Sequence, residues 1–228
     1  MEIANNIIRH YLKNVYFING TAYAGKSTMC AMLAERFGLI HCEENYGMDE
    51  ILSIATQDEQ PNMNYFNTKK DWQEFLNRAP EAYEAWVDGN SRELAGFEVA
   101  KLIRISAERK VIVDTNIPCD LLKQIASYRQ VAIMLSPQAM SVDRFFDRED
   151  AEKQFLLSEI RKSSDPERTL ENFRACIARI NSRERCEAWQ NSGFFTLVRE
   201  DTEADTREEV LAKLAAHFGF TAEGSRIL

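Results

Sequence analysis

Glycine and proline are scarce in this chain, which has 9 glycines and 5 prolines among 228 residues. A typical protein carries about twice that share. Low-complexity disorder and collagen repeats need far more of both residues, so the composition excludes these classes. The scarcity favours a folded, helix-rich globular protein. The length suits one domain, and a 45% share of hydrophobic residues can supply a sizeable core.

Paired cysteines, surplus positive charge and long apolar runs are also missing. The cysteines are odd in number and lack C-x-x-C spacing, so we expect buried reduced thiols rather than a disulfide framework or a zinc site. They are Cys30, Cys42, Cys119, Cys176 and Cys186. With 28 basic and 36 acidic residues, the net charge of −8 argues against a nucleic-acid partner. No run approaches the roughly 20 apolar residues of a membrane helix, and the N-terminus lacks a targeting pattern. We therefore expect a cytoplasmic protein with no membrane partner.

Five short apolar segments rich in β-branched and aromatic residues have the composition of buried strands. The clearest are 15–18, 111–113 and 131–135, and the weaker ones are 39–42 and 194–198. Helical patterns lie between them, which predicts parallel pairing through right-handed crossovers. The expected fold is therefore an α/β three-layer sandwich, whose ligands would bind at the carboxyl ends of the strands.

Two segments have the pattern of helices that cover such a sheet. Residues 26–37 carry apolar side chains at helical spacing and are followed by Gly38, which suits the left-handed conformation after a helix. Residues 206–218 begin with Thr206 and Glu209 at the spacing of a capping box. Both helices should pack one apolar face on the sheet.

Longer helical segments interrupt the alternation of strands and helices. Residues 48–109 are mainly helical, and residues 151–191 predict one or two long helices, with a helix start at the Ser-Asp-Pro-Glu sequence of residues 164–167. No repeat or Gly/Ser linker separates these pieces, so we expect insertions into a single domain spanning 1–228.

A phosphate-binding motif follows the first predicted strand. Residues 20–28 match G-x-x-x-x-G-K-[ST], the Walker A pattern, between a strand and a helix as that motif requires. Backbone N–H groups at a helix N-terminus favour phosphate. Lys26 would reach the β- and γ-phosphates, Ser27 would bind Mg²⁺, and Thr28 would support the helix start or the α-phosphate. The residues expected to bind nucleotide are Gly20, Ala22, Tyr23, Ala24, Gly25, Lys26, Ser27 and Thr28.

With this motif the chain resembles the P-loop kinases of small molecules, a group that includes nucleoside and nucleotide kinases, shikimate- and gluconate-type kinases and chloramphenicol phosphotransferase. The resemblance follows most of the chain in the order of its elements, but only residues 20–28 are specific. Many such kinases have glycine where this chain has Tyr23, and the Ala-Gly-Lys-Ser ending is similar to the antibiotic-phosphotransferase variant. The resemblance implies the P-loop NTPase fold with strand order 2-3-1-4-5, and ATP and Mg²⁺ as cofactors. It also implies a helical acceptor lobe at about 48–109, and a lid with further helices at about 137–191.

Three acidic residues lie where the resemblance implies catalytic carboxylates. Asp114 closes the third strand, where P-loop enzymes hold a water ligand of Mg²⁺, although a turn or helix cap has the same pattern. The Asp-Thr-Asn-Ile-Pro sequence that starts there matches neither the nucleotide-kinase nor the nucleoside-kinase signature. Glu43 and Glu44 follow the second strand, where nucleoside kinases and the antibiotic phosphotransferase have a general base. Either glutamate could act as this base, and a solvated acidic turn is the alternative.

The resemblance further implies an arginine-bearing lid after the fourth strand. Arg144 and Arg148 are four residues apart, so on a helix they would share one face and could meet the transferring phosphoryl group together, with Lys153 nearby. The acidic residues among them fit ordinary surface ion pairs equally well. In the acceptor lobe, the aromatic residues of 62–86 either form a pocket for a flat ring or pack against each other.

The expected function is ATP- and Mg²⁺-dependent transfer of the γ-phosphate to a hydroxyl of a small metabolite, with nucleoside-like acceptors preferred. The alternatives are a nucleoside monophosphate kinase and a regulatory module that binds nucleotide without catalysis. The small-molecule acceptor is the one expected partner, and a homodimer stays open.

Overall fold

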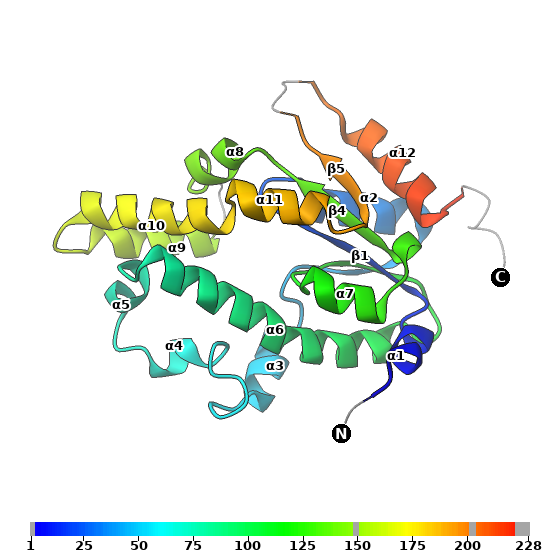
Figure 1. Ribbon diagram of the computed structural model, residues 1–228, viewed down its shortest axis with the longest axis horizontal. Coiled ribbons are helices and arrows are strands. Elements are labelled where there is room, and N and C mark those ends of the chain that lie inside the picture. The colour runs from blue at the N-terminus through cyan, green and yellow to red at the C-terminus, as the bar shows by residue number, and fades with distance from the viewer. Residues whose placement is uncertain (1–2, 148–150, 201–203, 222–228) are drawn as a thin grey trace.

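The computed structural model describes residues 3–147, 151–200 and 204–221 and contains a five-stranded parallel sheet. Its strands are β1 (Val15–Gly20), β2 (Ile40–Cys42), β3 (Val111–Asp114), β4 (Val131–Leu135) and β5 (Phe195–Val198). The order is β2-β3-β1-β4-β5, and each neighbouring pair is parallel (Figure 1). The predicted α/β sheet and its order are confirmed. Because the strands are parallel, their carboxyl ends share one edge, where Ile18 pairs with Asp114 and Gly20 with Met134.

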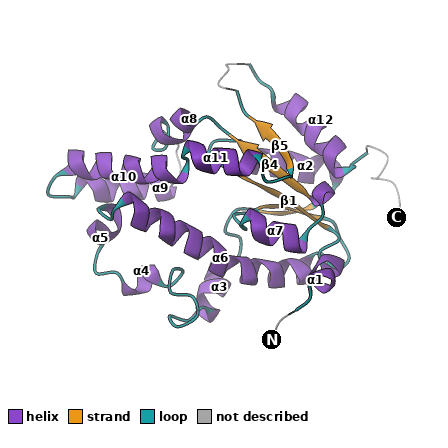
Figure 2. Cartoon of the chain, in the orientation of Figure 1, coloured by secondary structure: helices purple, strands orange, loops and turns teal. Residues whose placement is uncertain are grey.

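Helices surround the sheet and extend beyond it (Figure 2). The first half of the chain contains α1 (Asn5–Tyr11), α2 (Lys26–Phe37), α3 (Met48–Ile54), α4 (Tyr65–Thr68), α5 (Trp72–Leu76) and α6 (Pro80–Ile105). The second half contains α7 (Cys119–Ile125), the 3₁₀ turn η1 (Tyr128–Gln130), α8 (Gln138–Asp143), α9 (Ala151–Arg161), α10 (Pro166–Ile180), α11 (Arg183–Gln190) and α12 (Arg207–Phe218).

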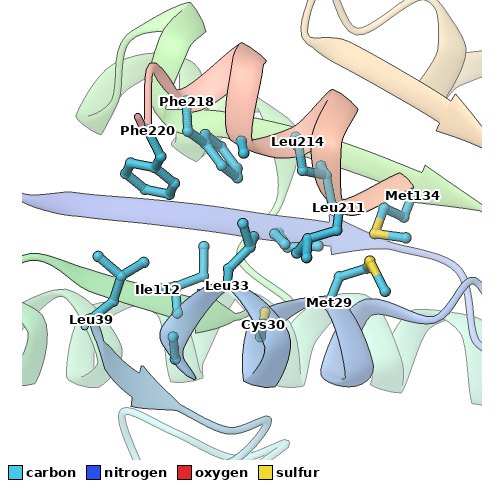
Figure 3. Packing of buried hydrophobic residues seen from close by; sticks show 14 of the residues in the cluster. Met29, Cys30, Leu33, Leu39, Ile112, Met134, Leu211, Leu214, Phe218 and Phe220 are labelled. Atoms are coloured by element: carbon cyan, nitrogen blue, oxygen red, sulfur yellow. The ribbon is translucent and has the colours of Figure 1, made fainter. Parts of the chain in front are cut away.

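Both faces of the sheet are covered because strand side chains alternate between them. In β3, Ile112 points to the face covered by α2 and α12, where Leu33 of α2 lies beside it and Leu214 of α12 belongs to the same buried cluster (Figure 3). Val111 and Val113 point to the opposite face, which α1, α6, α7 and α11 cover. Every residue of β3 and β4 is buried, as expected for central strands.

A helical lobe extends from the sheet on the side opposite α12 (Figure 1). We define it as α4, α5, α8, α9, α10 and the first half of α6. Its core is aromatic, with Phe75 and Phe173 among the buried side chains and Trp86 packed against them. This lobe combines parts of both long insertions, because α6 and α10 pack side by side.

The segment 151–191 forms three helices, so the prediction of one or two long helices was wrong. The first break has a clear cause: the carboxylate of Asp165 accepts the N–H of Arg168 at 3.1 Å, and Pro166 begins α10. The N-cap is thus Asp165 and not Ser164. The second break lies at Asn181, and Ser182 caps α11 by accepting the N–H of Arg185.

Two further local expectations have mixed outcomes. α2 ends at Gly38 with a φ of 65°, as predicted. The capping box at the start of α12 is absent, because Glu209 pairs with Lys213 at 2.6 Å and the side chain of the N-cap residue Thr206 accepts no backbone N–H. All five cysteines are free thiols; Cys119 and Cys186 are half-buried, so the expected full burial holds only for the other three. Among the described residues, no helix is both long and apolar enough to cross a membrane.

Candidate active site

The loop of residues 20–28 leaves β1 through a conformation that only glycine allows. Gly20 has a φ of 136°, and a Cβ there would overlap the carbonyl of Met134. That carbonyl accepts the N–H of Thr21 at 3.0 Å, which holds the start of the loop against β4. Gly25 has a φ of 89° and precedes the first residue of α2. Both motif glycines are therefore required by the backbone.

Two carbonyl groups of the loop accept hydrogen bonds from side chains outside the loop. The hydroxyl groups of Ser136 and Ser141 donate to the Ala22 carbonyl at 2.6 and 3.1 Å. Arg199 Nη1 donates to the Tyr23 carbonyl at 2.8 Å. Because the C=O and N–H of a trans peptide point in opposite directions, these bonds turn the N–H groups toward the hollow of the loop.

The N–H groups at the start of α2 are available for a ligand. Within the described parts of the chain, the backbone N–H groups of Ala24, Gly25, Lys26 and Ser27 have no hydrogen-bond acceptor. They add to the positive end of the helix macrodipole, so the loop fits an anion such as phosphate.

Lys26, Ser27 and Asp114 meet beside this loop. Ser27 Oγ donates to Asp114 Oδ2 at 2.7 Å, and Lys26 Nζ lies 3.8 Å from Asp114 Oδ1. Lys26 and Asp114 are both buried, and Asp114 Oδ1 has no hydrogen-bond partner among the described residues. Burial raises the pKa of Asp114, while Lys26 and the Ser27 hydrogen bond oppose this shift.

This group of residues fits Mg²⁺ bound together with a polyphosphate. The ion prefers oxygen ligands and usually takes one or two from the protein, with water and phosphate completing the set. A hydroxyl and an unpartnered carboxylate oxygen are such ligands. No cluster of three or more His, Cys, Asp or Glu that could hold a metal occurs in the described regions.

The two candidate bases are at the end of β2. Glu43 and Glu44 are exposed and belong to a turn in which Tyr46 N–H donates to the Glu43 carbonyl at 3.2 Å and Asn45 is left-handed. Glu44 Oε1 accepts from the amide of Asn116 at 2.8 Å. Since Asn116 lies just after Asp114, this bond ties Glu44 to the strand end that carries Asp114.

The predicted lid is described only in part. Arg144 is exposed and caps the C-terminus of α8, and Arg148 lies outside the described residues. Lys153 on α9 has its Nζ 5.8 Å from the ring centroid of Tyr23. The ring of Tyr23 is buried, and its φ is 63°. The segment after β4 thus brings Lys153 close to the loop of residues 20–28, and the lid stays a prediction.

The aromatic residues of 62–86, where an acceptor pocket was predicted, pack mainly against one another. Phe75 lies 5.2 Å from Trp86 and 5.7 Å from Tyr83, measured between ring centroids. The guanidinium of Arg78 stacks on Tyr65 at 4.2 Å. These contacts favour the packing alternative over a pocket for a flat ring.

Glu98 was missed by the sequence reasoning. This residue of α6 is 6% exposed, and its Oε1 has no partner among the described residues. Burial raises its pKa to about 8, with Asp114 and Glu44 adding to the rise and a hydrogen bond with Thr115 opposing it. The available signal was a carboxyl group on the apolar stripe of Leu94 and Leu102.

A cavity of about 530 Å³ beside the loop was also missed. Gly25, Thr28, Met29, Met134 and Leu197 lie along it, together with the residues that follow β5. Thr28 therefore faces this cavity. Arg199 also lies along it, and the available signal for Arg199 was a basic residue directly after the last strand.

The comparisons with known proteins add no assignment: no protein-family model matches the chain, and a search of curated proteins finds no match.

Proposed function

We propose that this protein is a P-loop kinase that transfers the γ-phosphoryl group of ATP to a hydroxyl of a small molecule. The observation that carries the proposal is the meeting of Lys26, Ser27 and Asp114 beside backbone N–H groups that have no acceptor within the described chain. Such a group needs a polyanion and a cation to satisfy it.

The loop residues 24–27 and Asp114 each have a defined task in this function. The N–H groups of Ala24 to Ser27 bind the β-phosphate, and Lys26 bridges to the γ-phosphate and stabilises the charge that develops during transfer. Ser27 and Asp114 would hold Mg²⁺, which when bound shields the charges of the β- and γ-phosphates. Catalysis then depends on positioning, because no covalent intermediate is required.

The cavity beside Gly25 and Thr28 suits the base of the nucleotide. Its apolar side chains, Met29, Met134 and Leu197, offer a surface for a flat ring, and it adjoins the start of α2 where the phosphates bind. A nucleoside triphosphate could therefore occupy the loop and the cavity together.

Glu44 is the better candidate for the general base. Its hydrogen bond with Asn116 fixes the carboxylate beside the end of β3, and the base must lie near the hydroxyl that attacks the γ-phosphoryl group. Glu43 takes part in the turn through its backbone carbonyl, which accepts the Tyr46 N–H.

The charges around this edge favour an acceptor without a phosphate. Arg92 pairs with Asp120 at 3.0 Å, and Lys101 pairs with Glu50 at 2.6 Å. The carboxylates of Glu44 and Asp114 would repel an acceptor phosphate. A nucleoside-like alcohol is thus favoured over a nucleoside monophosphate.

An assay of acceptor-dependent ADP release tests the proposal. A panel of hydroxylated metabolites would be offered with MgATP to the wild type and to Lys26→Ala. We expect at least one acceptor to be turned over, and Lys26→Ala to lower that rate by roughly 10³-fold. Lys162→Ala is the control, because Lys162 lies on the surface in an ion pair with Glu159.

Two results would contradict the proposal. Turnover by Lys26→Ala at the wild-type rate would exclude a P-loop mechanism. Tight ATP binding without turnover of any acceptor would favour a regulatory module that binds nucleotide without catalysis.

A further inference from the structure

Arg199 joins the end of the sheet to the phosphate loop. It follows β5 directly, and its N–H donates to the Leu135 carbonyl at 2.7 Å, so its backbone continues the β4–β5 ladder. Its guanidinium reaches across the edge and donates to the Tyr23 carbonyl at 2.8 Å. The same side chain lies along the cavity beside the loop. One residue therefore contacts both parts of the candidate nucleotide site.

Arg199 holds the peptide between Tyr23 and Ala24. Tyr23 has a φ of 63°, which is rare for an aromatic residue. Rotation of the Tyr23–Ala24 peptide changes ψ of Tyr23 and φ of Ala24, and it leaves this φ unchanged. The hydrogen bond from Arg199 opposes that rotation, and a charged donor makes it one of the stronger bonds of the loop.

The orientation of this peptide decides where one of the loop N–H groups points. With the Tyr23 carbonyl directed outward to Arg199, the Ala24 N–H must point the opposite way. That N–H has no acceptor within the described residues. Rotation of the peptide would remove it from the hollow of the loop and put a carbonyl oxygen in its place, which would repel phosphate.

We propose that Arg199 is a positioning residue that keeps the Tyr23–Ala24 peptide in the orientation that binds phosphate. This inference rests on the proposed function, since it takes residues 20–28 as the site of the polyphosphate. It assigns Arg199 an effect on phosphate affinity even when no base occupies the cavity.

Affinities for two probes separate this role from simple contact with a base. Binding of inorganic tripolyphosphate and of ATP, both with Mg²⁺, would be measured by calorimetry for the wild type, Arg199→Ala and Arg207→Ala. We expect Arg199→Ala to weaken both ligands by about tenfold. Arg207 is the matched control, because it lies along the same cavity but its guanidinium pairs with Asp205 at 2.6 Å. Arg207→Ala should leave the tripolyphosphate affinity unchanged.

A second variant tests the mechanism by rescue. Arg199→Lys keeps a charged donor that can bind the Tyr23 carbonyl. It should therefore lose less tripolyphosphate affinity than Arg199→Ala does. Thermal unfolding without ligand would verify that all variants are folded.

The outcomes distinguish this inference from the proposed function. If Arg199→Ala weakens ATP but not tripolyphosphate, Arg199 contacts only the base and the inference is wrong. An equal loss of tripolyphosphate affinity in Arg199→Lys and Arg199→Ala would also overturn it. If the wild type binds neither probe, the proposed function fails, and the inference fails with it.

Discussion

Within the described residues, polar groups of the helical lobe bond one another, whereas two buried carboxylate oxygens at the carboxyl edge of the sheet lack hydrogen-bond partners. Asn172 of the lobe donates to the carbonyls of Leu76 and Arg78, both at 3.0 Å. At the edge, Asp114 Oδ1 and Glu98 Oε1 have no hydrogen-bond partner among the described residues.

This difference indicates that the helical lobe contributes mainly to stability and that the carboxyl edge of the sheet holds the candidate site. Buried polar atoms without partners cost on the order of 1–3 kcal/mol each, so they persist where a ligand satisfies them. The lobe, by contrast, buries aromatic surface at no such cost. Substitutions in the lobe should therefore lower the free energy of unfolding and leave turnover intact. Substitutions at the edge should lower turnover without lowering the free energy of unfolding.

The largest expected effect is on the stability of the lobe. Phe75→Ala removes a ring that is 3% exposed and should lower the free energy of unfolding by about 4 kcal/mol. Phe155→Ala is the control: Phe155 is 42% exposed, so its loss should cost about 1 kcal/mol. Urea unfolding measures both values, and ATP affinity should stay at the wild-type value. A loss of ATP affinity without a loss of stability would contradict the comparison.

At the edge, Glu44→Gln should lower acceptor turnover by roughly 100-fold, which corresponds to about 2.7 kcal/mol of transition-state stabilisation. The unfolding free energy should not change, because Glu44 is exposed. Glu43→Gln is the matched control and should stay within about twofold of the wild type. If Glu43→Gln instead causes the loss and Glu44→Gln does not, the base is Glu43.

The titration of Glu98 should lower the free energy of unfolding of the protein as the pH rises. Its pKa is about 8 in the folded protein and near 4.5 in its ordinary state, so between these values the folded state binds a proton that the unfolded state has released. The free energy of unfolding therefore falls across this window as the pH increases.

Glu98→Gln removes that titration. The variant should match the wild type in stability near pH 4.5 and be more stable than the wild type above pH 8. Urea unfolding of both proteins across this pH range measures the difference. An equal decline in the two proteins would show that another group is responsible.

The elements that depend on local signals could be predicted from the sequence. The sheet order was expected from the kinase resemblance, and the strands were expected from apolar runs such as 131–135, which matches β4 in both bounds. The loop of residues 20–28 was found from the spacing of Gly20, Gly25 and Lys26. The strands and this loop are determined by residues that are neighbours in the chain, whereas the sheet order depends on distant pairings and came from the resemblance alone.

The missed features depend on contacts between distant residues. Arg199 acts on a carbonyl 176 positions away, and no local pattern marks that pairing. The position of Glu98 on an apolar stripe was a signal of burial, but its closeness to Asp114 and Glu44 depends on the fold. The helix break at Asn181 was also missed, because neither proline nor glycine marks it. Pro166, in contrast, marks the break before α10.

The smallest expected effect concerns the start of α10, on the lobe side of the comparison. Asp165→Ala removes the side chain that accepts the Arg168 N–H and should cost about 1 kcal/mol of unfolding free energy. Ser164→Ala is its neighbour and control, and should cost almost nothing because Ser164 does not cap the helix. Turnover should be unchanged in both variants, since the cap contributes to the lobe alone. An equal loss of stability from Ser164→Ala would move the cap to Ser164, and a loss of turnover from Asp165→Ala would show that the lobe and the edge are coupled.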